Sequence, residues 1–115
     1  MGQIVREYGP EMQRLSKKLE TALTMLYSQA KEAAQTEVAY KQAKATAVIG
    51  ADGTVLERES RADLATTKEL LAYRLASNLL DASKEAVRSR RAQISLLQSA
   101  IAAERTEAEF ERTRP

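Results

Sequence analysis

The sequence contains no cysteine and no histidine. A chain without cysteine has no disulfide, no thiolate metal ligand and no thiol nucleophile. A chain without histidine lacks the side chain that most often serves as a general base and as a ligand of transition metals. The carboxylates lie beside lysine and arginine at helix-surface spacing, which is typical of a solvated face. We therefore expect a protein that is not an enzyme and that holds no metal and no cofactor.

Glycine, proline and aromatic residues are also scarce. The 115 residues include 4 Gly and 2 Pro, and aromatic side chains make up 4%, whereas apolar residues make up 43% and charged residues 30%. This balance is typical of long helices and coiled coils. A short chain with few large side chains buries little apolar surface alone. We therefore expect an all-α protein that assembles into a homo-oligomer.

Long apolar runs are missing as well. The sequence has no run of about 18 apolar residues, which argues against a membrane-spanning helix. Residues 1–8 lack the apolar stretch of a secretory signal. We expect no membrane association and a cytoplasmic location.

A heptad pattern begins after Pro10, a residue that suits the first turn of a helix. It predicts a first helix over about residues 10–49, with one continuous seam along its length. The seam positions are Met12, Leu19, Leu26, Ala33, Tyr40 and Ala47, alternating with Leu15, Ala22, Gln29, Thr36 and Ala43.

The segment Gly50-Ala51-Asp52-Gly53 is the densest turn signal, and it predicts a turn over residues 50–54. Thr54 and Glu57 have the spacing of a capping box, in which the threonine hydroxyl accepts a bond from a free helix N–H. A turn this short makes the flanking helices antiparallel. The fold expected is a coiled-coil-like hairpin of two long helices, forming a single domain over residues 1–115.

The second helix is predicted over about residues 55–109, with two apolar stripes. One stripe consists of Ala72, Leu75, Leu79, Ala82 and Ala86. The other consists of Tyr73, Ala76, Leu80, Val87, Ile94, Leu97 and Ile101. We expect one stripe to contact the first helix and the other a second subunit, with the packing or oligomer seam at Leu80, Val87, Ile94, Leu97 and Ile101. The alternative is a bundle that packs every apolar residue within one chain. The tail over residues 104–111 is expected to fray.

The net charge is only +2, but basic residues are clustered along the chain. One cluster consists of Lys84, Arg88, Arg90 and Arg91, against the single carboxylate of Glu85. Facing residues of the hairpin should have numbers that sum to about 104, which places this cluster opposite Arg14, Lys17 and Lys18. Arg90 also falls within the apolar stripe, where a guanidinium needs a partner or a way out to solvent.

Lys41 and Lys44 form a second basic group, near the turn. Clustered cations bind phosphates by displacing condensed counterions. The simpler alternative is a solvated face whose ion pairs contribute little.

Two short stretches carry a family resemblance. Val38-Ala39-Tyr40-Lys41, with the turn at Gly50 after it, resembles the basic stretch of the UvsY-type phage recombination mediators. Ala86-Val87-Arg88-Ser89-Arg90, with Ile94 and Gln98 after it, is similar to a second stretch of that family. Ser95-Leu96-Leu97-Gln98-Ser99 is similar to the closing segment of small helical proteins that temperate phages encode beside replication and recombination genes.

The resemblance covers residues 38–101. It implies an oligomeric protein that binds single-stranded DNA and helps a recombinase displace single-strand-binding protein. It also implies that Lys41 contacts DNA, and it places Lys44 one residue away from a basic position of the family.

We therefore predict a phage-encoded accessory protein of DNA recombination or replication, located in the host cytoplasm. It would bind the backbone of single-stranded DNA, and it has a recombinase or a single-strand-binding protein as a candidate partner. The predicted contact residues are Lys41, Lys44, Arg88, Arg90 and Arg91. One alternative is an adaptor or inhibitor of a host protein that binds no nucleic acid. Another is a purely structural coiled-coil element.

Overall fold

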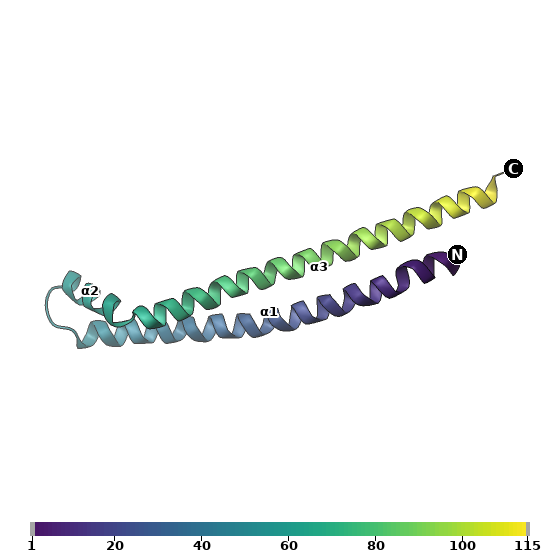
Figure 1. Cartoon of the computed structure of the whole chain (residues 1–115). Coiled ribbons are helices and arrows are strands. Elements are labelled where there is room, and N and C mark those ends of the chain that lie inside the picture. The colour runs from purple at the N-terminus through teal and green to yellow at the C-terminus, as the bar shows by residue number, and fades with distance from the viewer. Residues whose placement is uncertain (1, 115) are drawn as a thin grey trace. The chain divides into compact units, whose positions relative to one another are not determined.

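The computed structural model describes residues 2–114, with side chains described from Tyr8 onward. Three helices make up the chain: α1 (Gly2–Gly50), α2 (Val55–Ala65) and α3 (Thr67–Thr113) (Figure 1). No strand occurs within residues 2–114. The predicted all-α helical hairpin is therefore confirmed.

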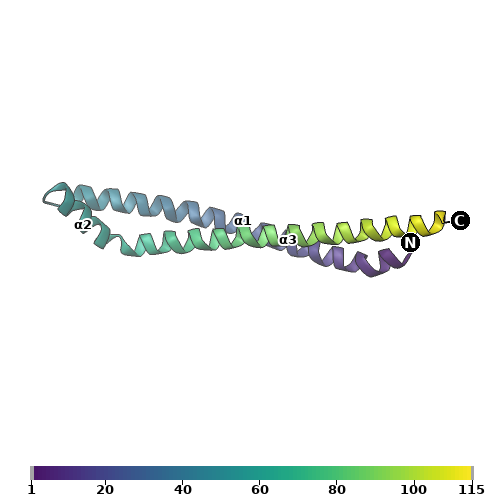
Figure 2. The ribbon, with the colours of Figure 1, turned by 90° about the horizontal axis from the view of Figure 1, so that it is seen from above.

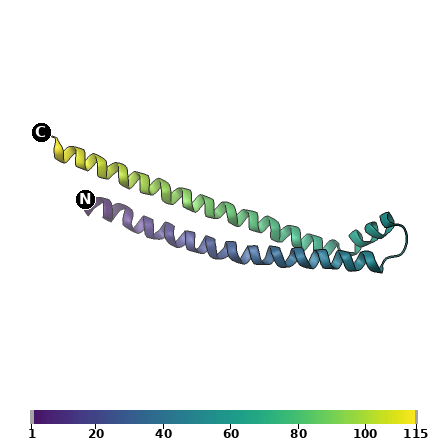
Figure 3. The same cartoon turned by 180° about the vertical axis from the view of Figure 1, so that it is seen from behind.

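The chain divides into two compact units, which are described separately. Unit 1 consists of Met1–Thr24 and Lys84–Pro115, and so contains the start of α1 and the end of α3. Unit 2 is the continuous segment Met25–Ser83, which contains the end of α1, the turn, α2 and the start of α3. In each unit the α1 and α3 segments run in opposite directions, as can be followed in Figures 1, 2 and 3. The prediction of a single domain stays a prediction.

The first helix begins earlier than the sequence pattern predicts. It starts at Gly2, and Pro10 lies inside it, so the predicted start at Pro10 is wrong. The segment before the proline is held to α3 within unit 1, because the Tyr8 hydroxyl donates a hydrogen bond to Glu104 Oε1 at 2.6 Å.

The heptad seam of α1 is confirmed along its whole predicted length. Every predicted seam residue from Met12 to Ala47 is buried or half-buried, with Leu15 and Ala33 the most enclosed. The regular alternation of three- and four-residue steps keeps these side chains on one side of the helix.

The turn occupies residues 51–54 and has the threonine bond of the predicted capping box. The Glu57 N–H donates to Thr54 Oγ1 at 3.2 Å, and this bond begins α2 at Val55. Gly53 has a φ of 109°, and a Cβ at this position would meet the Glu57 carboxylate. The left-handed backbone conformation therefore favours glycine at residue 53, and any larger residue would also displace the Glu57 side chain.

The second long helix is not continuous, so the predicted single helix over residues 55–109 is wrong. Thr66 interrupts it with φ −112° and ψ 17°, and α2 meets α3 there at a bend visible in Figure 2. The Thr66 hydroxyl is buried and donates to the Ala62 carbonyl at 2.7 Å, and the Thr67 hydroxyl donates to Asp63 and Leu64 carbonyls at 3.1 Å. Such bonds compete with the backbone and bend helices. Thr21 makes a similar bond inside uninterrupted α1, so a single bond of this kind does not by itself interrupt a helix.

The two apolar stripes of α3 have different surroundings. The stripe from Tyr73 to Ile101 is buried or half-buried, including Leu80, Val87, Ile94, Leu97 and Ile101. These five residues pack within one chain. The other stripe, Ala72, Leu75, Leu79, Ala82 and Ala86, is exposed. α3 continues to Thr113, past its predicted end at about residue 109. The fraying expected over residues 104–111 stays a prediction.

The pairing register of unit 2 differs from the sequence-based rule. Tyr40 stacks on Tyr73, with ring centroids 6.1 Å apart, whereas a sum of about 104 would pair Tyr40 with Leu64. Leu64 is instead 80% exposed on α2. The rule assumed that the second helix returns directly along α1. The residues that follow the turn form the separate helix α2, whereas the rule treated them as part of one helix paired with α1.

The core is thin. The buried apolar side chains of the described residues are Leu15, Ala33, Ala62, Ala76 and Val87. No large side chain of the described residues is less than 2% exposed. Within residues 2–114, no helix combines the length and the apolar character needed to cross a bilayer.

Candidate nucleic-acid interface

A groove of about 440 Å³ in unit 1 gathers basic side chains from α1 and α3. Its lining residues are Arg14, Lys17, Lys18, Thr21, Ala22, Ala86 and Arg90. The groove therefore brings together residues that lie far apart in the sequence. The predicted convergence of the basic segment around Arg90 with Arg14, Lys17 and Lys18 is confirmed for Arg90. We call Arg14, Lys17, Lys18 and Arg90 the groove cations.

Arg90 reaches the groove because it occupies a seam position of α3. It lies three residues after buried Val87 and four before half-buried Ile94, and it is itself half-buried. The small side chains of Ala22 and Ala86 line the same groove and leave space for the arginine stem. Arg90 Nη1 donates to Gln93 Oε1 at 3.1 Å. This partner is neutral, so the guanidinium charge is not compensated by it.

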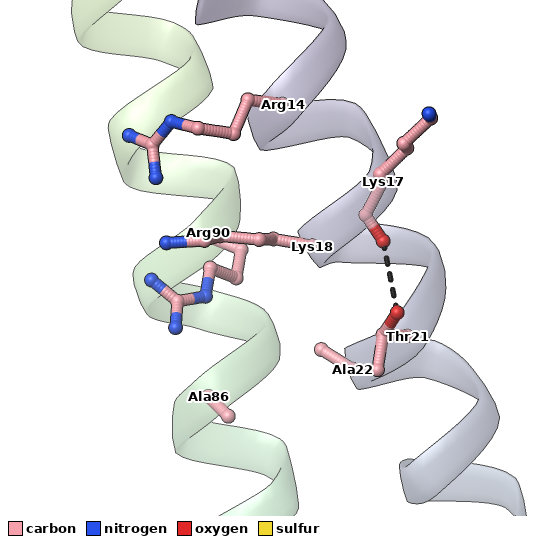
Figure 4. A pocket seen from close by; sticks show the side chains of 7 residues that line it. All are labelled: Arg14, Lys17, Lys18, Thr21, Ala22, Ala86 and Arg90. Atoms are coloured by element: carbon pink, nitrogen blue, oxygen red, sulfur yellow. Dashed lines mark hydrogen bonds between the residues drawn. The ribbon is translucent and has the colours of Figure 1, made fainter.

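The charged groups of Arg14, Lys18 and Arg90 point to the same side of the groove, over α3 (Figure 4). The ammonium of Lys17 points away from them in that view. Thr21 contributes a hydroxyl that is already used, because it donates to the Lys17 carbonyl at 3.1 Å. Three cationic groups thus face one region, which favours an anionic ligand.

Glu11 is the carboxylate that partly compensates this charge. Arg14 forms a two-pronged salt bridge with it, in which Nε lies 2.9 Å from Oε2 and Nη2 contacts Oε1. The hydrogen bond from Arg14 holds the pKa of Glu11 below its ordinary value. The Glu11 carboxylate therefore competes with any anion for Arg14.

No described carboxylate lies within 4.0 Å of the charged groups of Lys17, Lys18 or Arg90. An anionic ligand can therefore contact these three side chains without first breaking an ion pair. Arg91 is exposed on α3, and it too has no described carboxylate within 4.0 Å of its guanidinium. Arg88 differs, because it forms a salt bridge with Glu85 one turn away.

The two predicted lysines of unit 2 are both paired. Lys41 Nζ lies 2.9 Å from Glu37 Oε1, and Lys44 Nζ lies 3.2 Å from Asp63 Oδ1. The hydrogen bonds to these carboxylates raise the pKa of Lys41 and of Lys44 above their ordinary value. The Lys44–Asp63 pair connects α1 to α2. Neither lysine lines the basic groove of unit 1.

A second groove, in unit 2, has the opposite electrostatic character. It is lined by Ala39, Gln42, Ala43, Thr46, Ala47, Ala65, Thr66 and Glu69. Glu69 Oε2 is buried there without a hydrogen-bond donor among the described residues. A buried carboxylate oxygen repels phosphate, so this groove is not a candidate phosphate site.

Three basic residues that line the groove were not among the predicted DNA-contacting residues. Arg14, Lys17 and Lys18 lie on the first helix, where the five-residue segment 14–18 looks like an ordinary solvated face. The signal that identifies them is their position opposite Arg90 in the antiparallel pair, rather than any local motif.

Within residues 2–114, no group of three or more aspartate, glutamate, histidine or cysteine side chains lies close enough to hold a metal ion. No protein-family model, curated protein or solved structure matches this chain.

Proposed function

We propose that this chain binds single-stranded DNA through its phosphate backbone at the basic groove of unit 1, as an accessory protein of recombination or replication. The observation that carries the proposal is the common direction of the Arg14, Lys18 and Arg90 charged groups over one groove (Figure 4). Glu11 is their one carboxylate partner among the described residues.

The physical basis is simple electrostatics. Three like charges that face one region repel one another, and an anion placed among them removes that repulsion. A nucleic acid offers phosphates in series, so neighbouring cations can each contact one. Each contact also releases counterions that were condensed on the strand, which is the main driving force of such binding.

The groove predicts binding without base preference. No aromatic side chain lines it, and base stacking requires an exposed ring at the contact. Arginine and lysine that contact phosphates fix the position of the strand but do not distinguish its bases. We therefore expect similar affinities for oligonucleotides of different sequence.

One of the two stretches that resemble the UvsY-type mediators contributes residues to the groove. The stretch Ala86–Arg90, which is similar to that family, contributes Ala86 and Arg90 to the groove. The other resembling stretch contributes Lys41, which is paired with Glu37. The role in recombination and the phage origin rest on this resemblance, and DNA binding rests on the groove.

Fluorescence anisotropy with labelled oligonucleotides tests the proposal. For three phosphate contacts, the logarithm of the affinity should fall with the logarithm of salt concentration with a slope of about −2. Between about 50 mM and 200 mM salt the affinity should then drop about 20-fold. A single strand should bind more tightly than its duplex, and mixed-sequence and oligothymidine strands should bind alike.

No binding at low salt would overturn the proposal, as would a preference for duplex or an affinity insensitive to salt. A salt-sensitive complex with a host protein that persists after nuclease treatment, in a preparation that fails to bind oligonucleotides, would instead favour the adaptor alternative.

A further inference from the structure

The turn between α1 and α2 contains an aspartate that is followed directly by a glycine. Asp52 and Gly53 are both exposed, and neither belongs to a helix. The carboxyl group of an aspartate can close a five-membered ring on the nitrogen of the next peptide bond. Glycine in the next position leaves that nitrogen unhindered, because it carries no side chain. The chain's other two aspartates, Asp63 and Asp81, lie inside α2 and α3 and precede larger residues.

The Gly53 nitrogen is free to react. Its N–H donates no hydrogen bond to any described residue. The nitrogens that follow Asp63 and Asp81 lie inside helices, where each N–H bonds to a carbonyl of the preceding turn. Ring closure requires the nitrogen to lose its proton and to approach the aspartate side chain, and a helical backbone opposes both. Of the three aspartates, Asp52 is therefore the one whose neighbouring nitrogen can attack it.

Arg61 makes this peptide unit more reactive. Its Nη1 donates to the Asp52 main-chain carbonyl oxygen at 2.9 Å. That oxygen belongs to the same peptide unit as the Gly53 nitrogen. When the nitrogen loses its proton, the negative charge is shared with the oxygen, so a guanidinium that donates to the oxygen stabilises the attacking form. The contact thus promotes the reaction as well as linking α2 to the turn.

From these observations we infer that Asp52 is a self-modification site, which converts to isoaspartate through the Gly53 nitrogen with the help of Arg61. In the first step the nitrogen bonds to Asp52 Cγ, and the nitrogen proton and the carboxyl hydroxyl leave as water. In the second step water adds to a carbonyl of the ring. Addition at the main-chain carbonyl opens the ring to isoaspartate, and Arg61 polarises that carbonyl. Water is the sole other reactant, so mass and formal charge are unchanged.

The product has a different turn. The main chain now passes through the aspartate side-chain carbons, which lengthens it by one carbon just before the Thr54 cap of α2. The former main-chain carbonyl becomes a free carboxylate, so Arg61 gains an ion-pair partner in place of a neutral acceptor. The site is independent of DNA binding, because none of the groove cations lies in the turn.

Incubation of the unmodified chain at neutral pH and body temperature tests the site. An isoaspartyl methyltransferase with labelled S-adenosylmethionine counts the isoaspartate formed. Peptide mapping locates it, since the modified peptide keeps its mass but resists a protease that cleaves before aspartate. We expect isoaspartate to accumulate at Asp52 and not at Asp63 or Asp81. No isoaspartate at Asp52, or equal accumulation at the two helical aspartates, would overturn the proposal.

Three variants test the role of Arg61 as a positioning residue. Arg61→Gln should slow the reaction about fivefold, whereas Arg61→Lys keeps a charged donor and should retain at least about half of the rate. Arg58→Gln removes an equal charge from the exposed face of α2 and should react within about twofold of the unmodified chain. A loosened turn would speed ring closure, so loss of structure cannot imitate the expected slowing. An unchanged or faster rate for Arg61→Gln, or equal slowing by Arg58→Gln, would contradict the role of Arg61.

Discussion

Tyr40 of α1 stacks on Tyr73 of α3 in unit 2, with ring centroids 6.1 Å apart and ring planes inclined by 16°. Both rings are half-buried in a seam that otherwise consists mainly of small side chains. An aromatic pair is the largest contact available there, so it fixes which residues of the two helices face each other. Shifting one helix by a turn would place a ring against an alanine or a serine.

Replacement of Tyr73 by alanine should therefore destabilise the fold. We expect Tyr73→Ala to lower the free energy of unfolding by about 2 kcal/mol, because it removes half-buried apolar area and the ring pair. The control Tyr27→Ala changes a ring that is 71% exposed on the same helix as Tyr40, and it should cost less than about 0.5 kcal/mol. Urea unfolding followed by circular dichroism measures both. Equal losses for the two variants would show that the stacked pair does not set the register.

Two glycines near the turn should respond in opposite directions to the same substitution. Gly53→Ala should destabilise the chain by about 2 kcal/mol, because residue 53 has a left-handed φ of 109° and the added Cβ meets Glu57. Gly50→Ala places a methyl group in open space at the end of α1. It should be neutral or stabilise the chain by up to about 0.5 kcal/mol. Thermal unfolding of the two variants gives the comparison, and a stable Gly53→Ala chain would contradict the turn described above.

The seam of α1 was predictable from the sequence, because seam position there follows from periodicity alone. Met12 to Ala47 keep heptad spacing, and a long helix with one partner buries whatever lies on that stripe. The two stripes of α3 were also recognisable. Periodicity cannot say which of two apolar stripes meets the partner, because that choice depends on the path of the chain after the turn.

The register and the bend at Thr66 could not be predicted, for a common reason. Glycine and proline are the usual sequence signals of a helix interruption, and neither occurs between Thr54 and Thr113. The interruption comes from two adjacent threonines whose hydroxyls bond to carbonyls of the preceding turn. Threonines elsewhere make similar bonds within intact helices, so the bend depends on packing against α1 as well as on residue type.

The candidate site was predictable only in part. Arg90 stands out in the sequence because it falls in an apolar stripe. Lys41 and Lys44 were selected by resemblance, but Glu37 and Asp63 lie close enough to pair with them. The Lys41 partner lies four residues earlier on the same helix, and the sequence-based rule already placed Asp63 among the neighbours of this lysine pair. Partial neutralisation of the two lysines was therefore foreseeable from the sequence.

Removal of the carboxylate beside the groove should strengthen DNA binding. Glu11 forms a salt bridge with Arg14, which lowers the Glu11 pKa below its ordinary value, so this carboxylate competes with phosphate for that guanidinium. Glu11→Gln should raise the affinity for a single strand about threefold, the value of a typical exposed ion pair. The control Glu20→Gln removes an equal charge from the same part of α1, where no described cation lies within 4.0 Å of the carboxylate. Anisotropy titrations should show a smaller gain for this control, and an equal gain would mean that only net charge matters.

The central claim is that phosphates bind at the groove of unit 1 rather than at the paired lysines of unit 2. The most direct measurement compares two double variants that each remove two positive charges, Lys18→Gln with Arg90→Gln and Lys41→Gln with Lys44→Gln. Anisotropy with a labelled single strand should show about tenfold weaker binding for the first variant, with a salt slope less steep by about 1.4. The second variant should bind within about twofold of the unmodified chain. Equal losses, or a larger loss for the second variant, would contradict the account.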